Sequence, residues 1–143
     1  MRVLVDTNII LDYLLERELF VTDAEALFEA IQSQRIEGYV TATTLTDIFY
    51  IVRKERGIAI AKQAVSRILV VMKICTVDRT ILETAISSNL PDFEDAVQLA
   101  CAMALNLDAI VTRDPQGFAS ATLPILSAGE VLQLLSENLE ESN

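Results

Sequence analysis

Leu90-Pro91-Asp92-Phe93-Glu94-Asp95-Ala96-Val97 opens a segment that ends, after a run of small and apolar residues, at Thr112-Arg113-Asp114-Pro115. Apolar residues recur through the run at intervals of three and four, the spacing of a helix face packed on a core. The β-branched residues that follow, up to residue 112, indicate a short buried strand with a charged corner after it. The segment therefore predicts a helix that begins with carboxylates and a strand that ends beside one.

Each carboxylate of this segment also has a structural explanation. Asp92 is a good N-cap for the helix, and Asp95, three residues later, completes a variant of the capping box and complements the helix dipole. Asp114, which precedes a proline, is an ordinary turn residue. A functional interpretation therefore requires further acids that converge on the same place.

The rest of the chain alternates short apolar strands with helices. We expect strands at residues 2–6, 38–42, 74–77, 109–112 and 124–126, a capping box at 22–25, and a helical hairpin that turns at Gly57. This alternation predicts an α/β fold of three layers, α/β/α, around a mostly parallel sheet of about five strands. We expect one domain over residues 1–136 and an acidic, frayed tail over 137–143.

The composition limits the chemistry. The chain of 143 residues has no histidine, which excludes Ser-His and Cys-His nucleophilic catalysis and histidine-ligated zinc. A formal net charge of -10 argues against loose electrostatic binding of nucleic acid. Cys75 and Cys101 lack metal-ligand spacing, so we expect buried thiols. Without a signal-like segment or a membrane-length apolar run, we expect a cytoplasmic protein with no membrane partner.

Five aspartates fall where predicted strands end or the following helices begin. They are Asp6, Asp47, Asp92, Asp95 and Asp114. In a doubly wound parallel sheet all such positions share one rim. Carboxylates packed together repel one another unless a cation is present, and hard oxygens without cysteine or histidine favour Mg²⁺ or Mn²⁺. The oxygens of Asn8 and Thr112 would add neutral ligands or position a substrate phosphate.

Four motifs occur in order along nearly the whole chain: Val5-Asp6-Thr7-Asn8, Thr46-Asp47, Asp92-Phe93-Glu94-Asp95-Ala96, and Thr112-Arg113-Asp114-Pro115 with Gly117-Phe118 close behind. In these motifs the chain resembles the PIN domains, metal-dependent nucleases that include the VapC-type toxins, and especially their small stand-alone prokaryotic members. The resemblance implies a catalytic, metal-binding quartet with one accessory metal ligand, Asp92. The quartet is Asp6, Asp47, Asp95 and Asp114. The family more usually has glutamate at the second position, so the shorter Asp47 is expected to reach a metal through water.

The mechanism that we infer is hydrolysis of a phosphodiester bond by a metal-activated water. The resemblance implies RNA as the substrate and a short, basic antitoxin as a partner. The helical hairpin or residues 41–49 would offer a homodimer surface. Polar and basic side chains would contact the substrate, although a solvated helix face also explains the basic residues of the hairpin. The residues that we expect to bind the substrate are Asn8, Thr112, Arg113, Arg53, Lys54 and Arg56.

Three alternatives remain. A catalytically idle PIN scaffold that binds RNA or protein is favoured by Asp47 and by the net charge of -10. A phosphotransferase of the haloacid dehalogenase type would use Asp6 as its nucleophile but needs a second acid where Asn8 stands. A response-regulator receiver needs paired acids after the first strand and a late lysine, and the chain offers Asp6 and Arg113. Metal-dependent cleavage would separate the nuclease from the idle scaffold.

Overall fold

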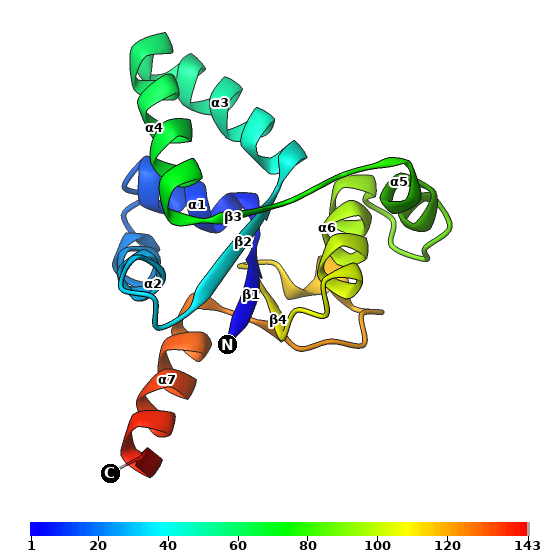
Figure 1. Cartoon of the computed structure of the whole chain (residues 1–143). Helices are drawn as coiled ribbons and strands as arrows, with labels where there is room; N and C mark the ends of the chain where they lie inside the picture. Colours follow the sequence, from blue (N-terminus) through cyan, green and yellow to red (C-terminus); the bar gives the residue numbers. More distant parts are fainter. Residues whose placement is uncertain (143) are drawn as a thin grey trace.

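A computed structural model describes residues 1–142, which fold into one sheet with helices on both faces (Figure 1). All the strand pairs within these residues are parallel, and they join five strands. The strands are β1 (Arg2–Val5), β2 (Glu37–Thr41), β3 (Lys73–Cys75), β4 (Ala109–Val111) and β5 (Ile125–Leu126). The predicted three-layer α/β fold is thereby confirmed.

The strands lie in the order β3-β2-β1-β4-β5. The chain moves outward from β1 to β2 and β3, and then returns to place β4 on the opposite side of β1. This reversal creates a crevice between the carboxyl ends of β1 and β4, and ligands bind in such crevices of doubly wound sheets. Sheet topology thus selects one place where polar side chains after β1 and β4 can meet.

Alternation along β1 divides the apolar side chains between two cores, because successive residues of a strand point to opposite faces. Val3 and Val5 enter the core on one face, and Leu4 enters the core on the other. In the described part of the chain, the first face is covered by α1 (Thr7–Leu14), α2 (Val21–Gln32), α3 (Ala42–Arg56), α4 (Ile58–Val71) and α7 (Ala128–Ser142). The second face is covered by α5 (Arg79–Ile86), α6 (Phe93–Ala104) and the short 3₁₀ helix η1 (Pro115–Phe118).

Local capping signals fix the starts of three helices. The side chain of Asp78 accepts a hydrogen bond from the backbone of Ile81 at the start of α5, and Asp92 does the same at the start of α6. At α7, Ser127 and Glu130 exchange bonds of 3.1 and 3.0 Å in a reciprocal capping box. The cap at Asp92 confirms the predicted start of α6.

One helix start differs from its prediction, and another places a predicted acid further along its helix. Helix α2 begins at Val21 without a side-chain cap, so the predicted box at 22–25 is wrong. The reason is a backbone turn in which Arg17 accepts from the N–H groups of Phe20 and Val21, which carries the chain directly into the helix. Helix α3 begins at Ala42 with Thr41 as its cap, and Asp47 therefore lies in the second turn.

The C-terminal segment also departs from expectation. Residues 137–142, for which we predict a frayed tail, continue α7 as far as Ser142. Residue 143 of that predicted tail lies outside the described residues. Among residues 1–142 we find no helix with both the length and the apolar character to cross a membrane.

Candidate functional site

Asp6 occupies the carboxyl end of β1, at the crevice that the strand order creates. Its Oδ1 accepts hydrogen bonds from the backbone N–H of Thr7 at 2.7 Å and from Nε2 of Gln98 at 3.0 Å. Its Oδ2 accepts a bond of 2.7 Å from the hydroxyl of Thr112. Only 8% of Asp6 is exposed. Three donors from three parts of the chain therefore hold this buried carboxylate in one orientation.

Thr112 joins the ends of the two central strands. Its hydroxyl donates to Asp6 after β1 and accepts from the backbone N–H of Asp114 at 3.0 Å, in the corner after β4. The residue is 1% exposed. The structure thus uses this hydroxyl, predicted as a ligand for metal or phosphate, to position two acids relative to each other.

The first turn of α6 brings two more carboxylates to the crevice. Asp92 caps the helix by accepting from the backbone N–H of Asp95 at 2.9 Å. Burial, together with the charges of Asp92, Asp6 and Asp114, raises the pKa of Asp95 to about 6. A Cβ atom on Gly117 would lie 2.7 Å from Oδ2 of Asp95 and 3.7 Å from Oδ2 of Asp114. Glycine at 117 therefore makes room for the carboxylate of Asp95.

Glu94 is a functional candidate that sequence reasoning missed. Its Oε1 accepts a bond of 3.2 Å from the hydroxyl of Thr7. Burial, followed by a hydrogen bond with Asp47, raises the pKa of Glu94 to about 7. The two acids lie 47 residues apart in the sequence. The motif Asp92-Phe93-Glu94-Asp95 contains this acid. Whether Glu94 meets Asp47 depends on where α3 lies in the fold, which the sequence does not show.

These side chains line one cavity of about 480 Å³, which we call the acidic cavity. All five aspartates predicted to share a rim line it. The full set of lining residues is Asp6, Thr7, Asn8, Leu11, Asp47, Ile51, Asp92, Glu94, Asp95 and Asp114. Six carboxylates with no cysteine among the lining residues present the hard oxygen donors that Mg²⁺ and Mn²⁺ prefer.

The lining residues fit a divalent cation in chemistry and burial. Within residues 1–142, the buried Oδ1 of Asn8 has no hydrogen-bond partner, which leaves a neutral oxygen available to a ligand. Burial, and after it the neighbouring acids, raise the pKa values of Glu94 and Asp95, so a cation would favour their ionised forms. No three acidic or thiol side chains in the described chain already have the arrangement that would hold an ion. Binding would therefore require these side chains to draw together.

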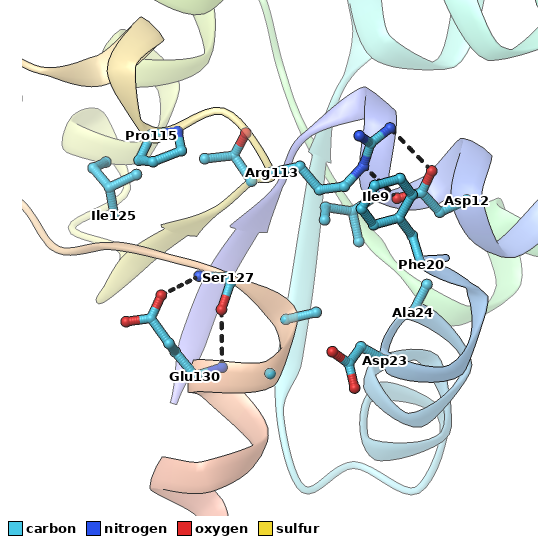
Figure 2. A pocket seen from close by; sticks show the side chains of 13 residues that line it. Ile9, Asp12, Phe20, Asp23, Ala24, Arg113, Pro115, Ile125, Ser127 and Glu130 are labelled. Atoms are coloured by element: carbon cyan, nitrogen blue, oxygen red, sulfur yellow. Dashed lines mark hydrogen bonds and ion pairs between the residues drawn. The ribbon is translucent and has the colours of Figure 1, made fainter. Parts of the chain in front are cut away.

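Arg113, predicted to contact substrate, lines a different pocket of about 430 Å³ (Figure 2). Its guanidinium donates two hydrogen bonds to Asp12, at 2.7 and 3.2 Å, and lies 3.9 Å from the ring centroid of Phe20. Asp12 is fully buried and also has Arg17 at 3.6 Å. Sequence reasoning missed Asp12 because its partner is 101 residues away. The ion pair fastens the β4 corner, which carries Thr112 and Asp114, to α1.

The basic residues predicted to contact substrate lie on the last turn of α3. Arg53, Lys54 and Arg56 are exposed and do not line the acidic cavity. Asp47 is on the same helix, and a rise of 1.5 Å per residue places the three basic residues about 9–14 Å further along its axis. The structure therefore puts a positively charged helix end beside, and not within, the acidic cavity.

A model of the PIN domain family matches residues 2–116 of this chain. The chain belongs to the PIN domain family. The match covers β1 to β4 and includes every acid of the acidic cavity. None of the curated proteins matches the sequence.

Solved structures with the same fold include toxins of toxin-antitoxin pairs. VapBC2 from Rickettsia felis, bound to a DNA fragment from its promoter, superposes with a TM-score of 0.68 at 14% identity, covering 89% of this chain and 98% of that one. VapC20 from Mycobacterium tuberculosis, a Sarcin-Ricin loop cleaving toxin, gives 0.68 at 15%, with 82% and 94% covered. A toxin-antitoxin complex from Klebsiella pneumoniae gives 0.65 at 22%, with 88% and 97% covered. At these identities the likeness concerns the PIN fold.

Proposed function

We propose that this PIN domain is a ribonuclease that depends on Mg²⁺ or Mn²⁺. One observation carries the proposal: carboxylates from β1, α3, α6 and the β4 corner meet in a single cavity at the reversal of strand order. Burial, together with the charges of Asp92, Asp6 and Asp114, raises the pKa of Asp95 to about 6. Structural caps have no need to converge in this way, whereas a site for a divalent cation requires it.

Asp6, Asp95 and Asp114 would hold the ion, with Asp47, Asp92 and Glu94 at the margin of the site. A bound divalent cation supplies Lewis acidity to the phosphodiester and to the attacking water. Gln98 and Thr112 orient Asp6, and Gly117 makes room for Asp95. With no histidine in the chain, a carboxylate of the cavity is the group that we assign to accept the proton of the water. Glu94, with a pKa of about 7, is suited to accept it near neutral pH.

RNA is the substrate that we infer. The comparison with VapC20, described as a Sarcin-Ricin loop cleaving toxin, supports this choice. The exposed Arg53, Lys54 and Arg56 would contact the phosphate backbone beside the acidic cavity. An RNA strand that crosses both the acidic cavity and the last turn of α3 would place one phosphate near the carboxylates. The adjacent phosphates would then lie on the basic end of the helix.

The partner that we propose is a short, basic antitoxin, because two of the similar structures are toxin-antitoxin pairs and this chain carries a net charge of -10. The α3–α4 hairpin would provide the homodimer surface. It exposes large apolar side chains, which mark interaction surfaces when they gather on one element. They are Tyr50, Ile58, Ile60, Leu69 and Val70.

The decisive experiment is cleavage of a panel of single-stranded, hairpin and transfer RNAs by the purified protein with Mn²⁺, Mg²⁺ or EDTA. Asp6→Asn should abolish cleavage, because this carboxylate is central to the cavity. Glu83→Gln, at an exposed ion pair outside the acidic cavity, should leave cleavage unchanged. Equal activity of wild type and Asp6→Asn, or activity in EDTA, would contradict the proposal.

A second function, an idle PIN scaffold that binds RNA or protein, is favoured by the contact between Asp47 and Glu94. That contact occupies Asp47 with another acid, and the described acids lack a ready-made ligand arrangement. An inert wild type that still binds RNA with equal affinity in Mg²⁺ and in EDTA would establish the scaffold. Binding is measured by fluorescence anisotropy on the same RNA panel.

A further inference from the structure

Two cysteines meet beneath the second face of the sheet. Cys75 is the last residue of β3, and Cys101 lies in the third turn of α6. Each is 1% exposed, and both belong to the core that packs against this face. Both are free thiols. The fold therefore brings together the thiols of residues from an edge strand and from the helix that begins at the acidic cavity.

The sulfur of Cys101 contacts two consecutive residues of the β3 end. The thiol of Cys75 forms a hydrogen bond with Cys101, and Sγ of Cys101 donates to the carbonyl oxygen of Thr76 at 4.0 Å. The bond from Cys75 lowers the pKa of the Cys101 thiol. The same bond, with burial, raises the pKa of Cys75. Cys101 is thus the thiol that ionises more readily, and Cys75 is in contact with it.

A pocket of about 400 Å³ lies against this pair. We call it the thiol pocket, and both cysteines line it together with Thr76, Asp78 and Thr80. These three polar residues are exposed, so the pocket opens to solvent. Hydrogen peroxide is little larger than water and fits easily in a space of this size.

We propose that Cys75 and Cys101 form an oxidation site, at which hydrogen peroxide converts the two thiols into an intramolecular disulfide. The thiol proton of Cys101 passes to solvent, and the ionised sulfur attacks one oxygen of hydrogen peroxide. The O–O bond breaks, a sulfenic acid forms, and the hydroxide that leaves takes up a proton to become water. The sulfur of Cys75 then attacks the sulfenic sulfur, the S–S bond forms, and the second oxygen leaves as water. Two thiols and one peroxide give one disulfide and two waters.

The disulfide would fasten α6 to the edge of the sheet. It closes the chain between residues 75 and 101 into a loop that contains α5 and most of α6. Gln98, one helical turn before Cys101, donates to Asp6 in the acidic cavity. The bond would thus restrain the helix whose side chains reach that cavity. The proposal does not depend on the nuclease function, because it concerns the thiols alone.

The test uses the reduced, full-length protein, treated with hydrogen peroxide under native conditions and then alkylated with N-ethylmaleimide in denaturant. We expect an intact mass lower by two hydrogens with no alkylation, whereas the untreated protein takes up one reagent molecule on each cysteine. Peptide mapping should join the fragments that contain residues 75 and 101. Closure of this loop should raise the melting temperature by about 5–10 °C, and dithiothreitol should reverse the change.

Single variants test the order of the steps. In Cys75→Ser, peroxide should produce a sulfenic acid at Cys101 that dimedone labels, and no disulfide. In Cys101→Ser, the labelling of Cys75 should be several-fold weaker. Full alkylation after peroxide would overturn the proposal, as would disulfides found only between molecules. A disulfide accompanied by loss of the folded circular dichroism signal would also overturn it, because the sulfurs would then meet only in the unfolded chain.

Discussion

At the scale of single residues, the acidic cavity depends on a glycine as much as on its carboxylates. Gly117 lies so close to Asp95 that a methyl group in its place would collide with Oδ2 at 2.7 Å. The carboxylate is one of the few groups there that could give way, and its displacement would also move it relative to Asp114. Sequence reasoning could note Gly117 within a motif, but the steric reason for it exists only in the fold.

Gly117→Ala should weaken Mg²⁺ binding about tenfold or more, the range found when residues that support a metal ligand are changed. The added Cβ would push Asp95 out of position, while the fold should tolerate alanine in a short 3₁₀ helix. Isothermal titration with Mg²⁺ measures the change. Gly129→Ala is the matched control, since its Cβ would meet Asp23 at 3.2 Å, an exposed carboxylate that can move. Equal affinities for the two variants would refute the role of Gly117.

Glu94 and Asp47 are neighbouring carboxylates of the acidic cavity, and a hydrogen bond joins them. Glu94→Gln removes one of two charges that repel each other, so we expect a higher melting temperature in EDTA at about pH 8. The same change removes a carboxylate from the acidic cavity, so the rise in melting temperature caused by Mg²⁺ should shrink. Thermal unfolding with and without Mg²⁺ gives both values. A lower melting temperature in EDTA would mean that Glu94 stabilises the fold as a structural partner.

At the scale of elements, the ion pair between Asp12 and Arg113 joins α1 to the corner after β4. Removing one partner of a buried pair leaves the other charge without compensation, which costs several kcal/mol. Arg17 stays near Asp12 at 3.6 Å, so the cost here lies toward the lower end of that range. The corner after β4, which carries Thr112 and Asp114, would lose its attachment to α1 at the same time.

Arg113→Ala should therefore lower the free energy of unfolding by about 3 kcal/mol. Urea denaturation followed by circular dichroism measures it. The control is Arg79→Ala, which removes an exposed pair with Glu83 on α5 and should cost no more than about 0.5 kcal/mol. If both variants lose the same stability, the buried pair does not hold the corner.

Most elements could be predicted from the sequence because their signals are local. The sequence of β1 is a run of apolar residues. Asp78 and Asp92 cap helices through backbone N–H groups only three residues away. The start of α2 could not be predicted, because the turn at Arg17 overrides the signal at 22–25. Glu94 and Asp12 were missed for another reason. Their roles depend on partners more than forty residues away.

At the scale of the whole molecule, the convergence of the acids follows from topology. An alternation of strands and helices predicts a parallel sheet, and in such a sheet residues after each strand share one edge. The order β3-β2-β1-β4-β5 adds what the sequence lacked, namely which strand ends are neighbours. Asp6 and Asp114 follow the two strands beside the reversal. The fold thus gathers six carboxylates, part of the excess that gives a net charge of -10, in the acidic cavity. The free energy of unfolding should therefore depend on pH.

In EDTA, stability should fall as the pH rises from about 4 to about 7. The folded-state pKa values of Asp95 and Glu94 are about 6 and about 7, above their ordinary values of 3.8 and 4.5. Between these limits the folded protein binds more protons than the unfolded chain, so the free energy of unfolding decreases with pH and levels off above the upper limit. Glu37, whose pKa is lowered by Lys73 from an ordinary value of 4.5, acts in the opposite sense, at the acidic edge of this window and below it.

Mg²⁺ should reverse the trend, because a cation that binds the ionised carboxylates stabilises the folded state more at high pH. We expect the rise in melting temperature caused by millimolar Mg²⁺ to be small near pH 5 and to grow toward pH 8. Asp95→Asn should flatten the pH dependence in EDTA and remove most of the Mg²⁺ effect, since it deletes a carboxylate with a raised pKa. Differential scanning calorimetry over this range measures both slopes. A melting temperature in EDTA that increases between pH 5 and pH 7.5 would contradict the raised pKa values of Asp95 and Glu94.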